Sequence, residues 1–187
     1  MPRALAADVL EDILFRRKSF DDAFAAGAGH RARASAMAPR DRSFSYNLVA
    51  TTLRRLGQID DLIDSCLESP LPSKARGALT ILRLGVAQLL FMNVSAHAAV
   101  DTSVDLAQMR CQGAYKKLIN AILRRLGREG TEMISAQDAL RRNTPDWLWD
   151  VWSKAYGENL TRQIANAHLS QPPLDITVKS NPELEAA

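Results

Sequence analysis

The amino-acid sequence predicts an all-α protein, a bundle of amphipathic helices with a β-type pattern only near residue 174. Three observations support this fold class. Apolar residues recur every three or four positions over most of the 187 residues, which is the period of one helix face. Glycine and proline stand where the periodic stretches stop, as is typical of helix ends. The stretch 75–92 is apolar on every side, which is expected of a helix at the centre of a bundle.

Four helical segments precede that central stretch. The spacing of Ser19 and Asp22 is typical of the cap of a short second helix. Residues 27–35 are small, polar and basic, which indicates a loop. Two further stripes end at Gly57 and Pro70, because glycine favours a helix C-terminus and proline cannot continue a helix. The inward positions of the three long stripes are Leu5, Val9, Leu10, Ile13 and Leu14; Phe44, Leu48, Val49, Thr52 and Leu56; and Ile59, Leu62, Ile63, Cys66 and Leu67.

Two helices are predicted after the central stretch. Ser95 can cap the first of them, and Gly127 and Gly130 are expected to close the second. Their inward positions are Val100, Val104 and Ala107, then Leu118, Ile119, Ile122, Leu123 and Leu126.

The pattern changes after residue 143. Thr144 and Pro145 are typical of a helix cap and first turn. One helix is expected before Gly157 and another after it. From Leu174 to Val178 apolar and polar residues alternate, which predicts a strand, although one strand is not stable alone. We therefore expect a helical domain over 1–143, and a helical connector with the start of an α+β domain over 144–187.

Composition narrows the class of protein. Hydrophobic residues make up 47% and charged residues 24%, which are ordinary values for a globular chain. No apolar run reaches the roughly 18 residues of a membrane span, and the first residues lack a signal-peptide pattern. We therefore expect a cytoplasmic protein. Cys66 and Cys111 have no CxxC spacing, so reduced thiols are the simpler interpretation, with a disulfide left open.

Charge is unevenly distributed along the chain. The formal net charge is +3, but residues 144–187 hold only three of the 24 basic residues and six of the 21 acidic ones. Residues 1–143 therefore hold 21 basic and 15 acidic residues, a surplus of +6. Such asymmetry indicates an anionic partner for the first part of the chain.

Several blocks resemble known families. LRLGVAQLL at 82–90, AHAAVD with VDLA at 96–107, and KKLINAILRR at 116–125 resemble NusB-like domains in order and spacing. PRDRSFSY at 39–46 with LRRL at 53–56, and PDWL, AYG and PPLDITV between 145 and 178, are similar to the RsmB (Fmu or Sun) family of ribosomal-RNA cytosine-C5 methyltransferases. In that family a NusB-like domain precedes the catalytic domain.

The resemblance implies an RNA-binding module that presents 16S ribosomal RNA to its own C-terminal methyltransferase domain, where S-adenosylmethionine binds. That family uses a nucleophilic cysteine within a Pro-Cys dipeptide. Here Cys66 follows Ser65 and Cys111 follows Arg110, and no glycine-rich loop follows a strand. We therefore expect no catalytic, cofactor-binding or metal-binding residue in this segment, which alone should be inactive.

Two rival interpretations come from other classes of protein. One is a stand-alone NusB-type transcription antitermination factor that binds RNA with a ribosomal-protein partner, and the Pro-Pro-strand ending argues against it. The other is a helical adaptor whose basic residues are ordinary solvated surface. Salt-dependent RNA binding would separate the adaptor from both RNA-binding interpretations.

Basic residues on the first and last helices of the bundle are the candidate RNA contacts. In NusB-like domains these helices contribute the RNA surface, and the start of a helix also favours phosphate. For each residue the alternative is a solvated helix face. The candidates are Arg3, Arg16, Arg17, Lys18, Lys116, Lys117, Arg124, Arg125 and Arg128. Arg40, Arg42, Arg54 and Arg55 form a second group of candidates, and for Arg40 and Arg42 structural pairing with Asp41 or another nearby carboxylate is the favoured interpretation.

A few other residues have two interpretations. Arg83 lies within the most apolar helix, so we expect it to have a carboxylate partner. Asp101 and Asp105 have the spacing of metal ligands but lack a third ligand nearby, and His97 is expected to have a structural role. The three tryptophans between 147 and 152 can stack on bases or pack against the connector, and their spacing favours packing.

Overall fold

The computed structural model describes residues 2–25 and 35–173, and every regular element within them is a helix. In chain order these are α1 (Pro2–Arg16), α2 (Phe20–Ala25), α4 (Pro39–Arg54), α5 (Leu56–Ser65), the 3-10 helix η1 (Ser73–Ala75), α6 (Arg76–Phe91), α7 (Ala96–Arg110), α8 (Lys116–Ser135), α9 (Ala139–Arg142) and α10 (Asp146–Leu169). The all-α prediction is confirmed for this part of the chain. The strand expected at 174–178 lies outside the described residues.

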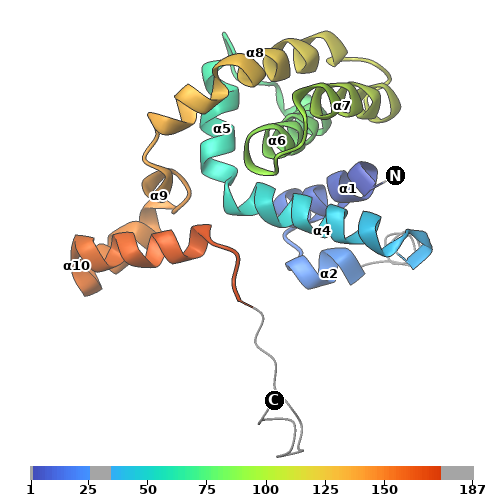
Figure 1. The fold of residues 1–187 in the computed structure, drawn as a ribbon. Helices are drawn as coiled ribbons and strands as arrows, with labels where there is room; N and C mark the ends of the chain where they lie inside the picture. Colours follow the sequence, from blue (N-terminus) through green and yellow to red (C-terminus); the bar gives the residue numbers. More distant parts are fainter. Residues whose placement is uncertain (1, 26–34, 174–187) are drawn as a thin grey trace, which may run out of the picture.

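α6 lies at the centre of the bundle, in contact with α1, α4, α5, α7 and α8 (Figure 1). It is the central helix that the apolar stretch 75–92 predicts. Its buried residues are Ala78, Thr80, Ile81, Leu82, Leu84, Gly85, Val86, Ala87 and Gln88. The Arg83 guanidinium donates to both carboxylate oxygens of Asp60 on α5, over 2.7 and 2.8 Å. The salt bridge predicted for Arg83 is therefore confirmed, and it removes the penalty of an unpaired cation near the core.

Side-chain contacts define the two ends of the bundle. Where α6 begins, the Arg76 guanidinium lies 5.4 Å from the centre of the Phe15 ring, near the end of α1. Where α6 stops, Arg3 Nε donates to Gln88 Oε1 over 2.6 Å. α1 and α6 are therefore antiparallel. Short connections join α6 to α7 and α7 to α8, so α8 begins at the same end of the bundle as α6.

α8 is longer than the sequence predicts. Gly127 and Gly130 were expected to close this helix, but it continues through both to Ser135, so that prediction is wrong. A glycine inside a helix costs only about 1 kcal/mol relative to alanine. Gly130 is buried, and a Cβ atom there would lie 2.9 Å from the Leu90 side chain. Close packing of α6 against α8 therefore outweighs the weak helix propensity.

Gly57 also has a different place from the one expected. It was predicted to end a helix, but α4 ends at Arg54 and Gly57 lies in the first turn of α5. The backbone of Arg142 on α9 approaches it so closely that there is no space for a Cβ atom. The glycine therefore allows α9 to pack against α5.

α9 and α10 lie to one side of the bundle, with α9 packed against α5 and α10 against α9 (Figure 1). Gly157 has φ 77° and ψ 162°, so two helices meet within α10 at this glycine, as predicted. Trp149 is buried beside the guanidinium groups of Arg141 and Arg162, which confirms the packing interpretation for this tryptophan. The Trp147 side chain is 68% exposed. No helix in the described ranges is long and apolar enough to cross a membrane.

Candidate nucleic-acid interface

Two lysines mark the start of α8. Lys116 and Lys117 are both exposed, and the first turn of this helix contains no acidic residue. The preceding loop brings the chain round sharply, since Gln112, Gly113 and Tyr115 all have positive φ angles. Unpaired amide groups at a helix start carry partial positive charge. The two ammonium groups and the helix dipole therefore combine at one exposed point.

The end of α1 carries a second basic group around one buried carboxylate. Arg16 Nη1 and Lys18 Nζ each lie 2.6 Å from an oxygen of Asp12, whose side chain is 2% exposed. Burial acts to raise the pKa of Asp12, but the hydrogen bonds and charges of Lys18 and Arg16 outweigh it, and the pKa lies below its ordinary value of 3.8. Arg17 is exposed beside them. Asp12 is thus paired with two cations, and the exposed Arg17 adds a third positive charge next to them in the chain.

The two basic groups lie at the same end of the bundle because α7 connects them. Arg110, the last residue of α7, pairs with Asp8 and with Glu11 on α1. Arg110 also lines a hollow of about 590 Å³ together with Arg16 and Arg76. The loop that follows Arg110 leads directly to the start of α8. We call this region the basic end, and its members that reach the surface are Arg16, Arg17, Lys18, Arg76, Lys116 and Lys117.

The other candidates on α8 lie nearer the opposite end of the bundle. Arg124 Nε donates to Asn120 Oδ1 over 3.1 Å and, with Arg128, lines a hollow beside the start of α7. Arg125 pairs with Glu129 over 2.9 Å, and Arg128 lies 3.8 Å from the same carboxylate. Glu129 therefore partly neutralises two of these three arginines. All three are separate from the lysines at the start of α8.

The Arg3 side chain contacts other helices of the bundle. It donates to Gln88, and its guanidinium lies 4.9 Å from the centre of the Phe44 ring, so it ties α1 to α6 and α4. Burial lowers the pKa of Arg3, and the nearby charge of Asp41 opposes that shift only in part. The nine basic residues predicted from the sequence to contact RNA are thus divided among three places. These are the basic end, the second half of α8 and the partly buried contact of Arg3. Arg76 and Arg110 were missed, because helical periodicity does not tell which helix ends meet.

The described residues offer no grouping of three or more His, Cys, Asp or Glu side chains that could hold a metal ion. His97 Nδ1 lies 2.5 Å from an Asp101 carboxylate oxygen, and both side chains are exposed. Asp101 is therefore engaged by a neighbour on its own helix. These observations assign no catalytic chemistry to this face of α7.

The structure defines a class of protein, an all-helical bundle built around one apolar helix, with cations gathered at helix ends. A model of the NusB family matches residues 1–128. The chain belongs to the NusB family. The resemblance of the central and last helices to NusB-like domains is confirmed by this match.

The chain is also similar in sequence to longer proteins. The chain is 31% identical over 173 residues to ribosomal RNA small subunit methyltransferase B of Shewanella oneidensis, covering 92% of this chain and 39% of that protein. It is 31% identical over 183 residues to a probable ribosomal RNA small subunit methyltransferase B of Synechocystis, covering 94% and 40%. For the Vibrio cholerae methyltransferase B the identity is 30% over 179 residues, covering 94% and 40%. The chain spans about 40% of the length of these relatives.

Proposed function

We propose that residues 1–143 form an RNA-binding domain that recognises 16S ribosomal RNA for a cytosine-C5 methyltransferase. The observation that carries this proposal is the basic end, where cations from α1, α6 and α8 gather at one end of a bundle of the NusB family. Guanidinium and ammonium groups bind phosphates and release counterions, which gives affinity that falls with salt. Residues 144–187 would then connect this domain to a catalytic domain.

The relatives support the methyltransferase proposal over a stand-alone antitermination factor. The family match ends at residue 128, whereas the similarity to the methyltransferases covers 92% to 94% of this chain. The similarity therefore includes part of α9 and α10, the connector beyond the bundle. A factor that consists only of the bundle has no need of this segment.

The described residues do not fit S-adenosylmethionine. In the methyltransferases that this chain resembles, the cofactor is expected at a glycine-rich loop between a strand and a helix, and the described ranges contain helices without strands. In the proposed function S-adenosylmethionine is bound by the catalytic domain, which would receive RNA from this one. We assign no methyl-transfer step to the residues described here.

The proposal predicts that the basic end dominates RNA affinity. The double variant Lys116→Glu/Lys117→Glu should weaken binding of a 16S ribosomal-RNA fragment by at least about tenfold at moderate salt. The slope of log K against log salt should become shallower, by roughly 0.7 for each single-strand phosphate that the variant no longer neutralises. Fluorescence anisotropy over a salt series measures both quantities.

Lys154→Glu on α10 is the matched control, since Lys154 is also an exposed lysine on a helix. We expect it to change the affinity by no more than about threefold, from long-range electrostatics alone. If the wild-type chain binds RNA with no salt dependence, or the control weakens binding as much as the double variant, the proposed interface is wrong.

A further inference from the structure

We propose that Tyr46 on α4 is a stacking site for an unpaired RNA base, with Arg42 and Arg54 as phosphate contacts on either side. This inference rests on the proposed function, because it takes RNA as the ligand, but it concerns a different surface from the basic end. Tyr46 is 48% exposed although it lies within a well-packed helix.

Two phenylalanines of α2 hold the Tyr46 ring in place. The ring centre lies 4.8 Å from Phe20, with the planes at 79°, and 5.3 Å from Phe24, with the planes at 35°. Both phenylalanines pack against the core. An exposed aromatic ring that is already fixed loses little conformational freedom when a base stacks on it. Stacking on aromatic rings is the common way in which proteins bind unpaired bases.

Tyr46 separates two open hollows, each of which contains one arginine. One hollow, of about 670 Å³, is lined by Tyr46 with Phe24, Arg42 and the carboxylate residue Asp21. The other, of about 720 Å³, is lined by Tyr46 with Phe20 and Arg54. Asn47 lines both, and its amide can donate to and accept from a base edge. A single RNA strand that crosses Tyr46 would therefore have a hollow for a nucleotide on each side.

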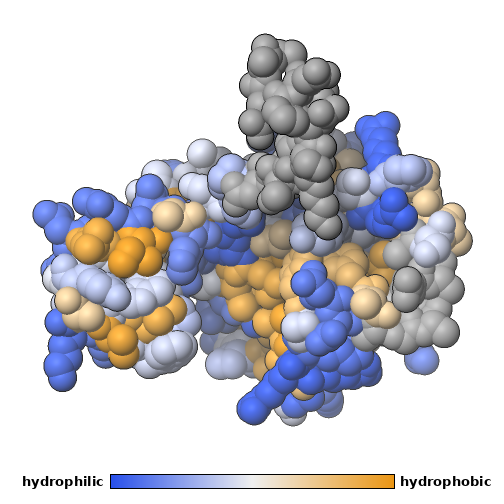
Figure 2. Space-filling view, turned by 90° about the horizontal axis from the view of Figure 1, so that it is seen from below, coloured by the Kyte–Doolittle hydropathy of each residue, from blue (hydrophilic) through white to orange (hydrophobic). Residues whose placement is uncertain are grey.

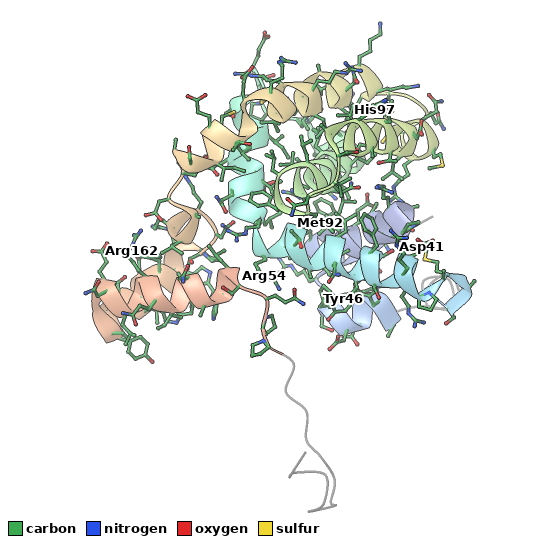
Figure 3. All side chains as sticks on the ribbon, in the orientation of Figure 1. Asp41, Tyr46, Arg54, Met92, His97 and Arg162 are labelled. Atoms are coloured by element: carbon green, nitrogen blue, oxygen red, sulfur yellow. The ribbon has the colours of Figure 1, made fainter. Side chains whose placement is uncertain are left out.

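The two arginines lie on either side of Tyr46 along α4. Arg42, Tyr46 and Arg54 are separated by four and eight residues, so they cover roughly 18 Å of helix axis at 1.5 Å per residue, and they turn through about 120° around it. Within the described ranges, neither guanidinium forms an ion pair with a carboxylate. Figure 3 shows Tyr46 and Arg54 on the lower side of α4.

The surroundings also suit a nucleotide. Seen from below, the molecule has a contiguous apolar area bordered by hydrophilic residues (Figure 2). The apolar lining of the Arg54 hollow comes from Ala50, Leu53, Met92, Pro172 and Pro173. An apolar floor alone would suit a polypeptide equally well. In the described part of the chain Arg42 and Arg54 have no carboxylate partner, and they lie on either side of a fixed aromatic ring, which favours a polyanion with flat bases.

The test uses the complete chain and two labelled RNAs, a short single-stranded oligouridine and a duplex of matched length. Tyr46→Leu keeps an apolar side chain against Phe20 and Phe24 but removes the aromatic face. It should weaken binding of the single strand about tenfold and leave duplex binding within about twofold. Tyr46→Phe keeps the ring and should stay within about twofold of wild type on both RNAs.

Tyr156→Leu is the matched control, since Tyr156 is a 57% exposed tyrosine on α10. It should leave both affinities unchanged, and thermal unfolding should show that Tyr46→Leu is still folded. Arg42→Ala and Arg54→Ala should each weaken single-strand binding and make its salt dependence shallower. Photocrosslinking with 5-iodouridine should modify Tyr46.

The outcomes distinguish the two proposals. If the wild-type chain binds neither RNA, the proposed function fails. If it binds RNA and Lys116→Glu/Lys117→Glu weakens that binding, but Tyr46→Leu has no effect, the base-stacking proposal alone fails and the surface is better explained as a polypeptide-docking face. Equal weakening for single strand and duplex would also overturn base stacking, because duplex bases are not available to stack on a side chain.

Discussion

Gly57→Ala should detach the segment 136–143 from α5 and lower the free energy of unfolding by about 2 kcal/mol. A Cβ atom at this position would lie 1.8 Å from the Arg142 carbonyl oxygen and 2.6 Å from its carbonyl carbon. Both are backbone atoms, so no side-chain rotation relieves the overlap. Overpacking of this kind costs about 1–3 kcal/mol, and alanine recovers only about 1 kcal/mol of helix propensity.

The same displacement should break a network of polar contacts beside Gly57. The backbone N–H of Gln58 donates to Asn143 Oδ1 over 3.1 Å, and Asn143 Nδ2 donates to Gln58 Oε1 over 2.9 Å. Gln137 Nε2 donates to Asp61 Oδ2 over 2.7 Å, and Gln58 is buried. A buried polar group left without a partner costs about 1–3 kcal/mol. Disruption of this network adds to the steric penalty.

Two measurements and one control test this prediction. Urea denaturation gives the change in stability, and limited proteolysis reports whether the segment 136–143 becomes accessible. Gly127→Ala on α8 is the control, because its nearest atoms to a new Cβ lie at 3.9 to 4.0 Å. It should be neutral or stabilise by up to about 1 kcal/mol. Equal effects of the two substitutions would show that the close approach of Arg142 to Gly57 is unimportant.

Asp12→Asn should lower the free energy of unfolding by about 2 kcal/mol at neutral pH. The Asp12 carboxylate is buried and accepts from Arg16 and Lys18, each over 2.6 Å. Hydrogen bonds to charged groups contribute about 1.5–3 kcal/mol. The Arg16 side chain is 70% exposed and can be solvated once its partner is gone, which keeps the effect below that of a fully buried pair.

The pH dependence has a definite sign. The pKa of Asp12 in the folded chain lies below its ordinary value of 3.8. Its ionised form is therefore stabilised by folding, and that contribution is present above about pH 4 and is lost as the pH falls through the folded pKa. The difference in unfolding free energy between wild type and Asp12→Asn should shrink as the pH falls below about 4.

Urea denaturation at several pH values measures this difference. Asp105→Asn is the control, since Asp105 is exposed on α7 and the described residues give it no ion pair. It should change stability by no more than about 0.5 kcal/mol. A difference for Asp12→Asn that stays constant with pH would contradict the proposed role of its ionised form.

Local patterns were sufficient for most of the helices. Leu5, Leu10, Leu48 and Ile59 were expected on inward faces and are almost fully buried. Ser19 accepts from the Asp22 amide N–H over 3.1 Å, as the predicted cap requires. These features depend on residues three or four positions apart, which a single sequence displays directly. The end of α8 was predicted wrongly because Gly130 is a point of close packing against Leu90 on another helix, and not a helix end.

The candidate site depended more on contacts between distant residues. Nine cations were proposed from their positions on the first and last helices, without a way to tell which had partners. Arg3 is held by Gln88, which is 85 residues away, and Arg110 reaches α1 from a distance of about one hundred residues. Tyr46 was noticed only as part of a family-like block, because its exposure results from how α2 packs on α4.

Local sequence patterns were therefore sufficient to predict the helical class, the central position of α6, the need of Arg83 for a partner and the positive surplus of the first 143 residues. Each of these follows from periodicity, composition or the cost of burying charge. Which cations gather at the basic end and which are held by carboxylates became clear from the folded structure. Those outcomes depend on which helix ends meet, and that is set by the packing of the whole core and not by any local pattern.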